Sequence, residues 1–289
     1  MKRLMLIFGI LLLMTGLTMA EDEYTHYENE ISYQKADRAV INIDFGMGRL
    51  DIARGQGDFL ARVVGDYDEE LFYVVAKYEE SGNTGYFTFE FKKVKGISLK
   101  NWAGDEKENK WKLLLGDKIP LQIDLNAGMS ANNFDLSGLK IEKLDMDVGM
   151  SSNEIIFTKP NPVVMTDFIM DAGKSSTEIY GLGNANFRRL TIDSGMSSSI
   201  LDFSGRIDYS ADITIDASMS STEIILPNNI GLKVKAPTIF TSTISLPRNL
   251  TETGRGMYES KDYNNARNQF YFDIDSGMGS VDVKFAESM

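Results

Sequence analysis

An aspartate recurs at a fixed place in the short phrase Asp-x-Gly-Met-Ser, which returns along the chain. Four central copies, 22 to 24 residues apart, contribute Asp147, Asp171, Asp193 and Asp216, and Ser218 takes the place of the glycine in the last of them. Carboxylate oxygens are the ligands that calcium prefers, so cations could lie between aspartates of neighbouring repeats. The competing hypothesis is an Asx turn, in which each aspartate accepts hydrogen bonds from the backbone N–H groups of the following Gly-Met-Ser. We favour the turn, assign no metal site, and keep the cation ladder as the alternative.

Two other polar sets return with the same period. A glutamate follows each serine pair at Glu154, Glu178 and Glu223. Paired carboxylates can act as acid and base in glycan cleavage, but an acidic repeat supplies such pairs by chance, so no catalytic residue is assigned. The serines are expected to be small corner residues that hydrogen-bond along the stack, with a hydroxyl surface for glycans or ice as the alternative. Lys174 takes the place of the methionine and is expected to pair with an aspartate or to extend its charge past the corner.

The composition excludes several classes of site. His26 is the only histidine and the chain has no cysteine, which removes transition-metal, Ser/His and Cys/His chemistry. We therefore expect no cofactor. A formal net charge of −12 argues against binding to nucleic acid or to anionic membrane surfaces.

The residues before each phrase alternate between apolar and polar, as in Leu144, Met146, Val148 and Met150. A period of two predicts half-buried strands, and the methionine is expected to share the inward face. After the serine pair the apolar positions shift by one, which indicates a bend where two short strands meet at a corner. A repeat in the low twenties of residues is typical of stacked architectures. The sequence therefore predicts an all-β fold, a β-solenoid with coils of about 20–24 residues; an antiparallel sandwich is the alternative.

The chain divides into four expected segments. Residues 1–20 have a positive end, an apolar run too short to span a membrane and a small-residue cleavage site, which together predict a secretory signal peptide. Residues 21–38 are expected to form a flexible leader and residues 39–120 an N-terminal β-subdomain or cap. Residues 121–289 are expected to form the solenoid, with a polar loop at 249–268. A secreted or periplasmic location follows, with no transmembrane segment in the mature chain.

Several short motifs resemble a known family. They are Asn109-x-Trp111-x-Leu113-x-Leu115, Pro120-x-x-Ile123, Ala127-Gly128, Asp135-Leu-Ser-Gly-Leu139 and the closing stretch at 273–283. Together they resemble the C-terminal domain of LiaF-type cell-envelope stress-response proteins and the related toast-rack and adhesin-like β-solenoids of bacteria. The resemblance implies a bacterial, extracytoplasmic β-solenoid without catalytic residues. LiaF-type regulators carry transmembrane helices and act on a membrane sensor kinase, whereas this chain carries a predicted signal peptide.

The expected function is that of an exported, non-enzymatic module at the bacterial cell envelope, structural or binding, with a role in envelope stress response or adhesion. Its partner would be a protein or a glycan. The alternative is a carbohydrate-active β-helix enzyme or a glycan-binding protein. A further possibility is a secreted descendant of the LiaF-type regulators that reports envelope stress to a sensor.

Overall fold

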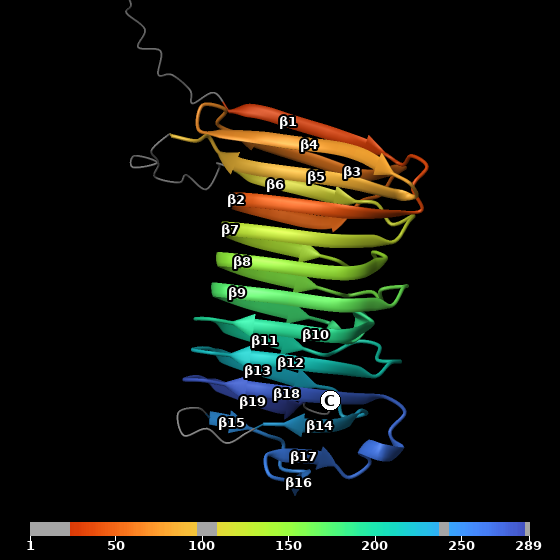
Figure 1. Cartoon of the computed structure of the whole chain (residues 1–289), viewed down its shortest axis with the longest axis vertical. Helices are drawn as coiled ribbons and strands as arrows, with labels where there is room; N and C mark the ends of the chain where they lie inside the picture. Colours follow the sequence, from red (N-terminus) through yellow and green to blue (C-terminus); the bar gives the residue numbers. More distant parts are fainter. Residues whose placement is uncertain (1–23, 97–108, 237–242, 287–289) are drawn as a thin grey trace, which may run out of the picture.

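Three long strands in the middle of the chain show how one repeat folds in this computed structural model, which describes residues 24–96, 109–236 and 243–286. They are β7 (Leu121–Asp135), β8 (Ile141–Ile156) and β9 (Met165–Tyr180). Each runs along one arm, bends at the Gly-Met pair and continues along a second arm. Neighbouring strands pair in parallel and in register through both arms, as at Asp124 and Asp145 or Phe134 and Ile155. The predicted all-β solenoid is confirmed, and its coils form one stacked column (Figure 1).

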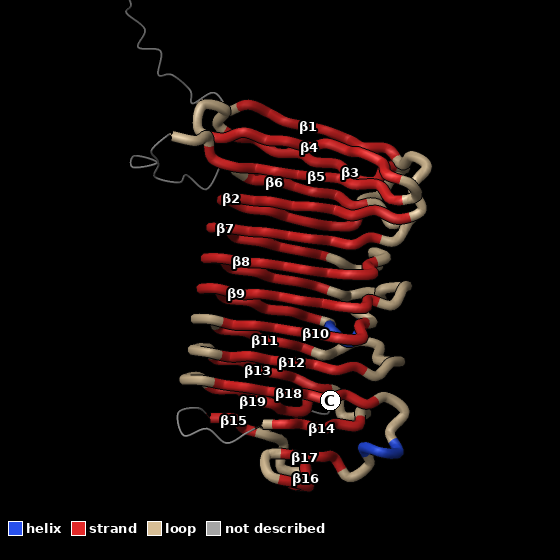
Figure 2. The backbone as a smooth tube through the Cα atoms, viewed as in Figure 1, coloured by secondary structure: helices blue, strands red, loops and turns tan. Residues whose placement is uncertain are grey.

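In the later coils the two arms are separate strands on either side of the bend. These coils are β10 (Phe187–Ser194) with β11 (Ser198–Asp202), β12 (Ala211–Ala217) with β13 (Ser221–Leu226), and β18 (Gln269–Ser276) with β19 (Ser280–Phe285). Each first arm pairs in parallel with the first arm of the next coil, and each second arm with the second. The two arms thus build two parallel ladders along the column (Figure 2).

The last coil in the chain is not the last coil in space. β18 and β19 pair on one side with β12 and β13, and on the other with β14 (Gly231–Lys235) and β15 (Thr243–Ser245). Beyond β14 lies an antiparallel hairpin of β16 (Leu250–Gly254) and β17 (Met257–Ser260), followed by a short 3-10 turn, η2 (Tyr263–Asn265). The prediction of a polar loop at 249–268 is therefore wrong, because this segment covers the end of the column with two strands.

The opposite end differs from the expected division at residue 120. β2 (Arg38–Arg54) is a complete coil that pairs in parallel with β7 through both arms. The remaining strands cover it and are β1 (Thr25–Ser32), β3 (Phe59–Tyr67), β4 (Phe72–Ser81), β5 (Thr84–Lys93) and β6 (Lys110–Leu115). β4 pairs with β5, and β1 with β3 and β3 with β6, all antiparallel. The prediction of a flexible leader is wrong over β1, and the predicted signal peptide lies outside the described residues.

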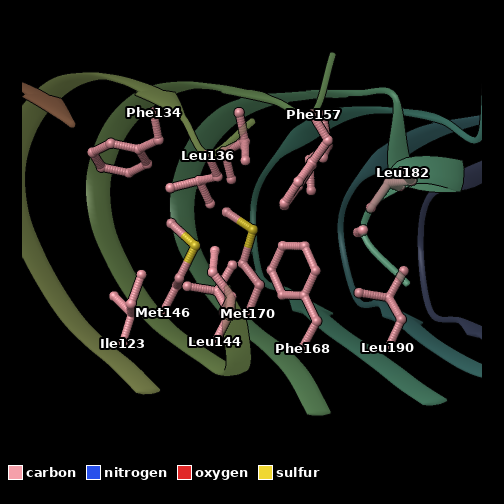
Figure 3. Close-up of a cluster of buried hydrophobic side chains, with 14 of the residues drawn as sticks. Ile123, Phe134, Leu136, Leu144, Met146, Phe157, Phe168, Met170, Leu182 and Leu190 are labelled. Atoms are coloured by element: carbon pink, nitrogen blue, oxygen red, sulfur yellow. The ribbon is translucent and has the colours of Figure 1, made fainter. Parts of the chain in front are cut away.

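The core fills the space between the two arms. In β8 the side chains of Leu144, Met146 and Val148 are buried from the first arm, and those of Asn153 and Ile155 from the second. Figure 3 shows the same layering in successive coils, with apolar side chains of the two arms facing one another. Each coil buries its apolar side against its neighbours, which is why a single repeat would not be stable alone.

In most coils the glycine of the phrase allows adjacent corners to stack closely, and Ser218 takes its place in one coil. A Cβ atom at Gly128 would lie 2.4 Å from the carbonyl oxygen of Gly46 in the coil before it, and one at Gly195 would lie 2.8 Å from the oxygen of Gly173. These distances are closer than real Cβ atoms approach an oxygen. A residue without a Cβ atom therefore lets adjacent corners stack at the strand spacing of about 4.8 Å.

The bend at the glycine also corrects the expected facing of the methionines. In β8 the inward alternation ends at Val148 and resumes at Asn153, so that Met150 lies outside the core. The phase shift thus begins at the glycine and not after the serine pair. The methionines of five phrases are between 47% and 66% exposed: Met129, Met150, Met196, Met219 and Met278. The prediction that they face inward is wrong, although the coils themselves are as predicted.

Candidate functional site

The aspartates of the phrase form one continuous line along the outside of the first arm. We call this line the acidic row, and its members in spatial order are Asp44, Asn126, Asp147, Asp171, Asp193, Asp216 and Asp275. The four aspartates predicted as a cation ladder are thus direct register neighbours, and all four are exposed. The repeat period alone was enough to bring them together.

Two members of the acidic row have raised pKa values, through partial burial first and the charges of neighbouring aspartates second. Partial burial raises the pKa of Asp171 above its usual range, and the charges of Asp193, Asp147 and Asp145 add to the effect. Partial burial likewise raises the pKa of Asp216, with contributions from Asp193 and Asp275, while a hydrogen bond with Ser218 opposes the shift. Carboxylates at the strand spacing repel one another, and together they produce a negative potential along the column.

At one end of the acidic row a lysine balances an aspartate, because Lys92 forms an ion pair with Asp44. Across residues 24–96, 109–236 and 243–286, no three Asp, Glu or His side chains are grouped so that they could hold a metal ion. The cation ladder stays a prediction.

The expected Asx turn is wrong for the coil at Asp193. The backbone N–H of Gly195 donates to the carbonyl oxygen of Ala172, and that of Met196 to the carbonyl oxygen of Gly173, both at 2.9 Å. These donors therefore belong to the ladder between coils and are not available to the aspartate. The Asp193 carboxylate therefore does not bond to these two donors, and its side chain is exposed.

Beside the acidic row, at the bend itself, lies a second line of side chains that the sequence analysis placed inside. We call it the methionine ridge, and its members in spatial order are Met47, Met129, Met150, Lys174, Met196, Met219 and Met278. The sequence analysis placed this position on the inward face, but Lys174 is exposed. A lysine at this place in the repeat could have indicated from the sequence that the position faces water.

Polar side chains occupy the inside of the bend. The side-chain amide of Asn132 donates to the side-chain oxygen of Asn153 at 2.7 Å, and that of Asn153 donates to the Thr177 hydroxyl at 3.1 Å. Asn132 and Asn153 also donate to the serine hydroxyls of their own coils, Ser130 and Ser151. This buried network pairs polar groups at the corner, and its serines bond within their own coil. The predicted bonding along the stack is seen between Ser221 and Ser280, whose hydroxyl oxygens are 3.2 Å apart.

The glutamates lie on the outside of the second arm, where they are only partly brought together. Glu154 and Glu178 are register neighbours, but Ile200 separates Glu178 from Glu223. A shallow recess of about 300 Å³ contains Glu154 and Glu178 together with Arg49. The Tyr180 hydroxyl donates to Glu178 at 2.6 Å, and this hydrogen bond is the main reason that the pKa of Tyr180 rises to about 12.

Comparisons with known proteins agree with this architecture. Residues 20–162 match the N-terminal domain of toast_rack, DUF2154. A solved structure of a candidate cell adhesion protein from Clostridium sporogenes is 19% identical, with a TM-score of 0.50 over 91% of this chain and 100% of the other. A candidate adhesin from Bacteroides fragilis is 8% identical, with a TM-score of 0.40 over 91% of this chain and 97% of the other.

A search of curated proteins finds no match to the chain. Within the part of the chain that the structure describes, no helix has the length and apolarity needed to cross a membrane. The predicted resemblance to the toast-rack and adhesin-like β-solenoids is confirmed. Residues 20–162 of the chain are thus similar to the N-terminal domain of the toast-rack family.

Proposed function

We propose that the protein is an exported, non-enzymatic β-solenoid that binds a protein or glycan at the bacterial cell envelope. The observation that carries this proposal is the acidic row, in which Asp147, Asp171, Asp193 and Asp216 stand in register on consecutive coils. Export rests on the predicted signal peptide at residues 1–20. The name of the C. sporogenes structure, which refers to cell adhesion, favours a role of the same kind here.

The column suits this role because its binding groups are already ordered. Each aspartate of the acidic row is attached to a strand held by ladders on both sides, so little backbone entropy is lost when a partner binds. Repetition at about 4.8 Å allows many weak contacts with a repetitive or extended partner. Partial burial, together with the charges of neighbouring aspartates, raises the pKa values of Asp171 and Asp216, and a cationic partner would relieve the repulsive part.

The test is co-sedimentation of the purified protein with peptidoglycan sacculi and with envelope membranes of the producing bacterium. The native chain is expected to pellet with one of the two fractions, and high salt is expected to weaken the interaction. A variant with all four aspartates replaced by asparagine is expected to bind at least about tenfold more weakly. Glu252→Gln, which removes an exposed carboxylate outside the acidic row, is the control. Failure of the native chain to pellet with either fraction would overturn the proposal.

A glycan-cleaving enzyme is the second candidate, and the recess with Glu154 and Glu178 is the observation that favours it. Incubation with sacculi and measurement of released reducing ends separates the two functions. We expect no release above background. Release that is lost in Glu178→Gln and kept in Asp171→Asn would assign the recess as a catalytic site.

A further inference from the structure

The methionine ridge is the most unusual surface of the molecule. Among the described residues, eight large hydrophobic side chains are exposed, and five of them are methionines of the ridge. The other three, Tyr73, Tyr86 and Val164, do not belong to the repeated phrase. Folding normally places such side chains inside, so a line of them in water calls for another explanation.

The fold does not require methionine at this place. Lys174 occupies the same register position, next to Met150, and its side chain is exposed. A charged side chain is therefore compatible with the bend. The buried positions of the column use Ile, Leu, Val and Phe as well as Met, whereas every apolar member of the ridge is a methionine. What the ridge residues share beyond apolarity is a thioether sulfur.

Lys174 divides the ridge into two runs of three methionines. The run of Met196, Met219 and Met278 is exposed throughout, whereas Met47 in the other run is half-buried against the core. The backbone N–H of Met219 donates to the carbonyl oxygen of Gly195 at 2.9 Å, and that of Met278 to the oxygen of Ser218 at 2.7 Å. These bonds hold the three residues on consecutive coils, about 4.8 Å apart. Metal–sulfur bonds are about 2.3 Å long. Flexible methionine side chains at this spacing can therefore bring two or three sulfurs to one ion.

The surroundings of this run attract cations. Asp193, Asp216 and Asp275 precede the three methionines by three residues each and lie in register with one another. Three residues of extended chain span at most about 10 Å, close to the screening length at physiological salt. The chain has no cysteine, so thioethers are its only soft sulfur donors. The exclusion of transition metals in the sequence analysis rested on His and Cys ligands and did not consider thioethers. Soft sulfur ligands select Cu(I), whereas calcium and magnesium require oxygen ligands.

We propose that Met196, Met219 and Met278 form a surface site for a soft monovalent metal ion, Cu(I), held by thioether sulfurs beside the acidic row. This site is independent of the envelope-binding function proposed above. The rival explanation is an apolar docking ridge, because methionine is also common on adaptable protein-binding surfaces. Leucine keeps the apolar surface and removes the sulfur, so replacement by leucine distinguishes the two.

The experiment is anaerobic competition for Cu(I) between the full chain and the chromogenic chelator bicinchoninate. The native chain is expected to withdraw Cu(I) from the chelator, and the Met196→Leu/Met219→Leu/Met278→Leu variant to bind it at least tenfold more weakly. In the native chain, the carbon-13 methyl resonances of these three methionines should shift on titration with Cu(I). Because the positions are exposed, circular dichroism and the thermal midpoint should not change in the variant. Met129→Leu/Met150→Leu is the matched control and should keep the site.

Lys174→Met provides a test by gain of function, because it joins the two runs of the ridge. This variant is expected to bind more Cu(I) per chain than the native protein. Unchanged stoichiometry would overturn the claim that register spacing builds the site. No withdrawal of Cu(I) by the native chain, or equal affinity in the triple leucine variant, would overturn the proposal. Envelope binding that survives leucine but is lost with Met196→Glu/Met219→Glu/Met278→Glu, in a chain that does not bind Cu(I), would assign an apolar docking ridge instead.

Discussion

At the scale of the residue, the phrase Asp-x-Gly-Met-Ser combines a structural position with two surface positions. The glycine lies against a backbone carbonyl of the preceding coil, and the room for a Cβ atom there differs from coil to coil. The aspartate and the methionine on either side of it face solvent. Stacking explains why the glycine recurs, whereas nothing in the packing of the column explains why the aspartate and the methionine recur.

The stacked glycines of the phrase predict that replacement by alanine lowers stability by different amounts in different coils. A Cβ atom would lie 2.4 Å from the nearest carbonyl oxygen at Gly128, 3.0 Å at Gly149 and 3.3 Å at Gly173. Gly128→Ala is expected to lower the free energy of unfolding by about 1–3 kcal/mol, because the backbone must move to relieve the overlap. Gly149→Ala should cost less, and Gly173→Ala should be close to neutral, since the loss of unfolded-state entropy offsets a small overlap. Urea unfolding of the three variants measures the order, and a reversed order would contradict the stacking argument.

The acidic row predicts a stability that falls as pH rises. The pKa of Asp216 is raised in the folded state, so the folded chain binds more protons than the unfolded chain between the unfolded value, about 3.9, and the raised value. Stability is therefore lost as pH rises through that interval, and the full loss is present at pH 7. Asp216→Asn should raise the free energy of unfolding at pH 7 by about 0.3–1 kcal/mol, a small gain because the site is largely exposed and screened by solvent.

This gain should disappear below about pH 4, where the native carboxyl is also neutral, and should shrink in high salt. Glu252→Gln, outside the acidic row, is the control and should show neither dependence. Thermal melting between pH 3.5 and pH 8 measures both variants. A gain for Asp216→Asn that is constant with pH would show that repulsion along the acidic row is not its cause.

At the scale of the element, the sequence predicted the arms but not the point where their phase changes. Alternation from Leu144 continues formally through Met150, so period counting assigns one face to the whole run. The glycine breaks this alternation, because its backbone turns the corner and places the methionine outside. The acidic row did not depend on this point, since every aspartate lies before the bend. The methionine ridge lies at the bend, so its predicted facing depended on this point and was wrong.

The sequence analysis missed one strand at one end of the column, β1, and two at the other end, β16 and β17. β1 is polar, and only side chains such as Tyr27 and Ile31 pack on the core, where Tyr27 meets Trp111 with ring centroids 5.8 Å apart. The β16–β17 hairpin is similarly polar. A strand that ends a stack covers the core with one face and meets water with the other, and polar edges protect it from pairing with other chains. Such strands lack the apolar content by which sequence analysis recognises strands.

At the scale of the whole molecule, the position of the last coil could not be read from repeat order. The coil of β18 and β19 carries Asp275 and Met278, and it stacks on the coil of Asp216 and Met219. β14 and β15 carry no copy of the phrase and lie one coil further out, next to the hairpin. The chain thus places its well-matched coils together and its degenerate coil at the end, which repeat spacing along the sequence does not encode.

Because β18 and β19 lie between β12 and β13 on one side and β14 and β15 on the other, their removal predicts which part of the column would unfold. A chain that ends at residue 268 lacks the buried side chains of Phe270, Phe272, Ile274, Val281 and Val283. Their burial contributes at least about 5 kcal/mol, and the truncation removes one neighbouring strand from each of β12, β13, β14 and β15. Because coils contact only their neighbours, the damage should stay local. Hydrogen exchange should show lost protection over residues 211–260 and native protection over 121–180. A chain that ends at residue 286 is the control, and a loss of protection that reaches β7 would show that the column unfolds as one unit.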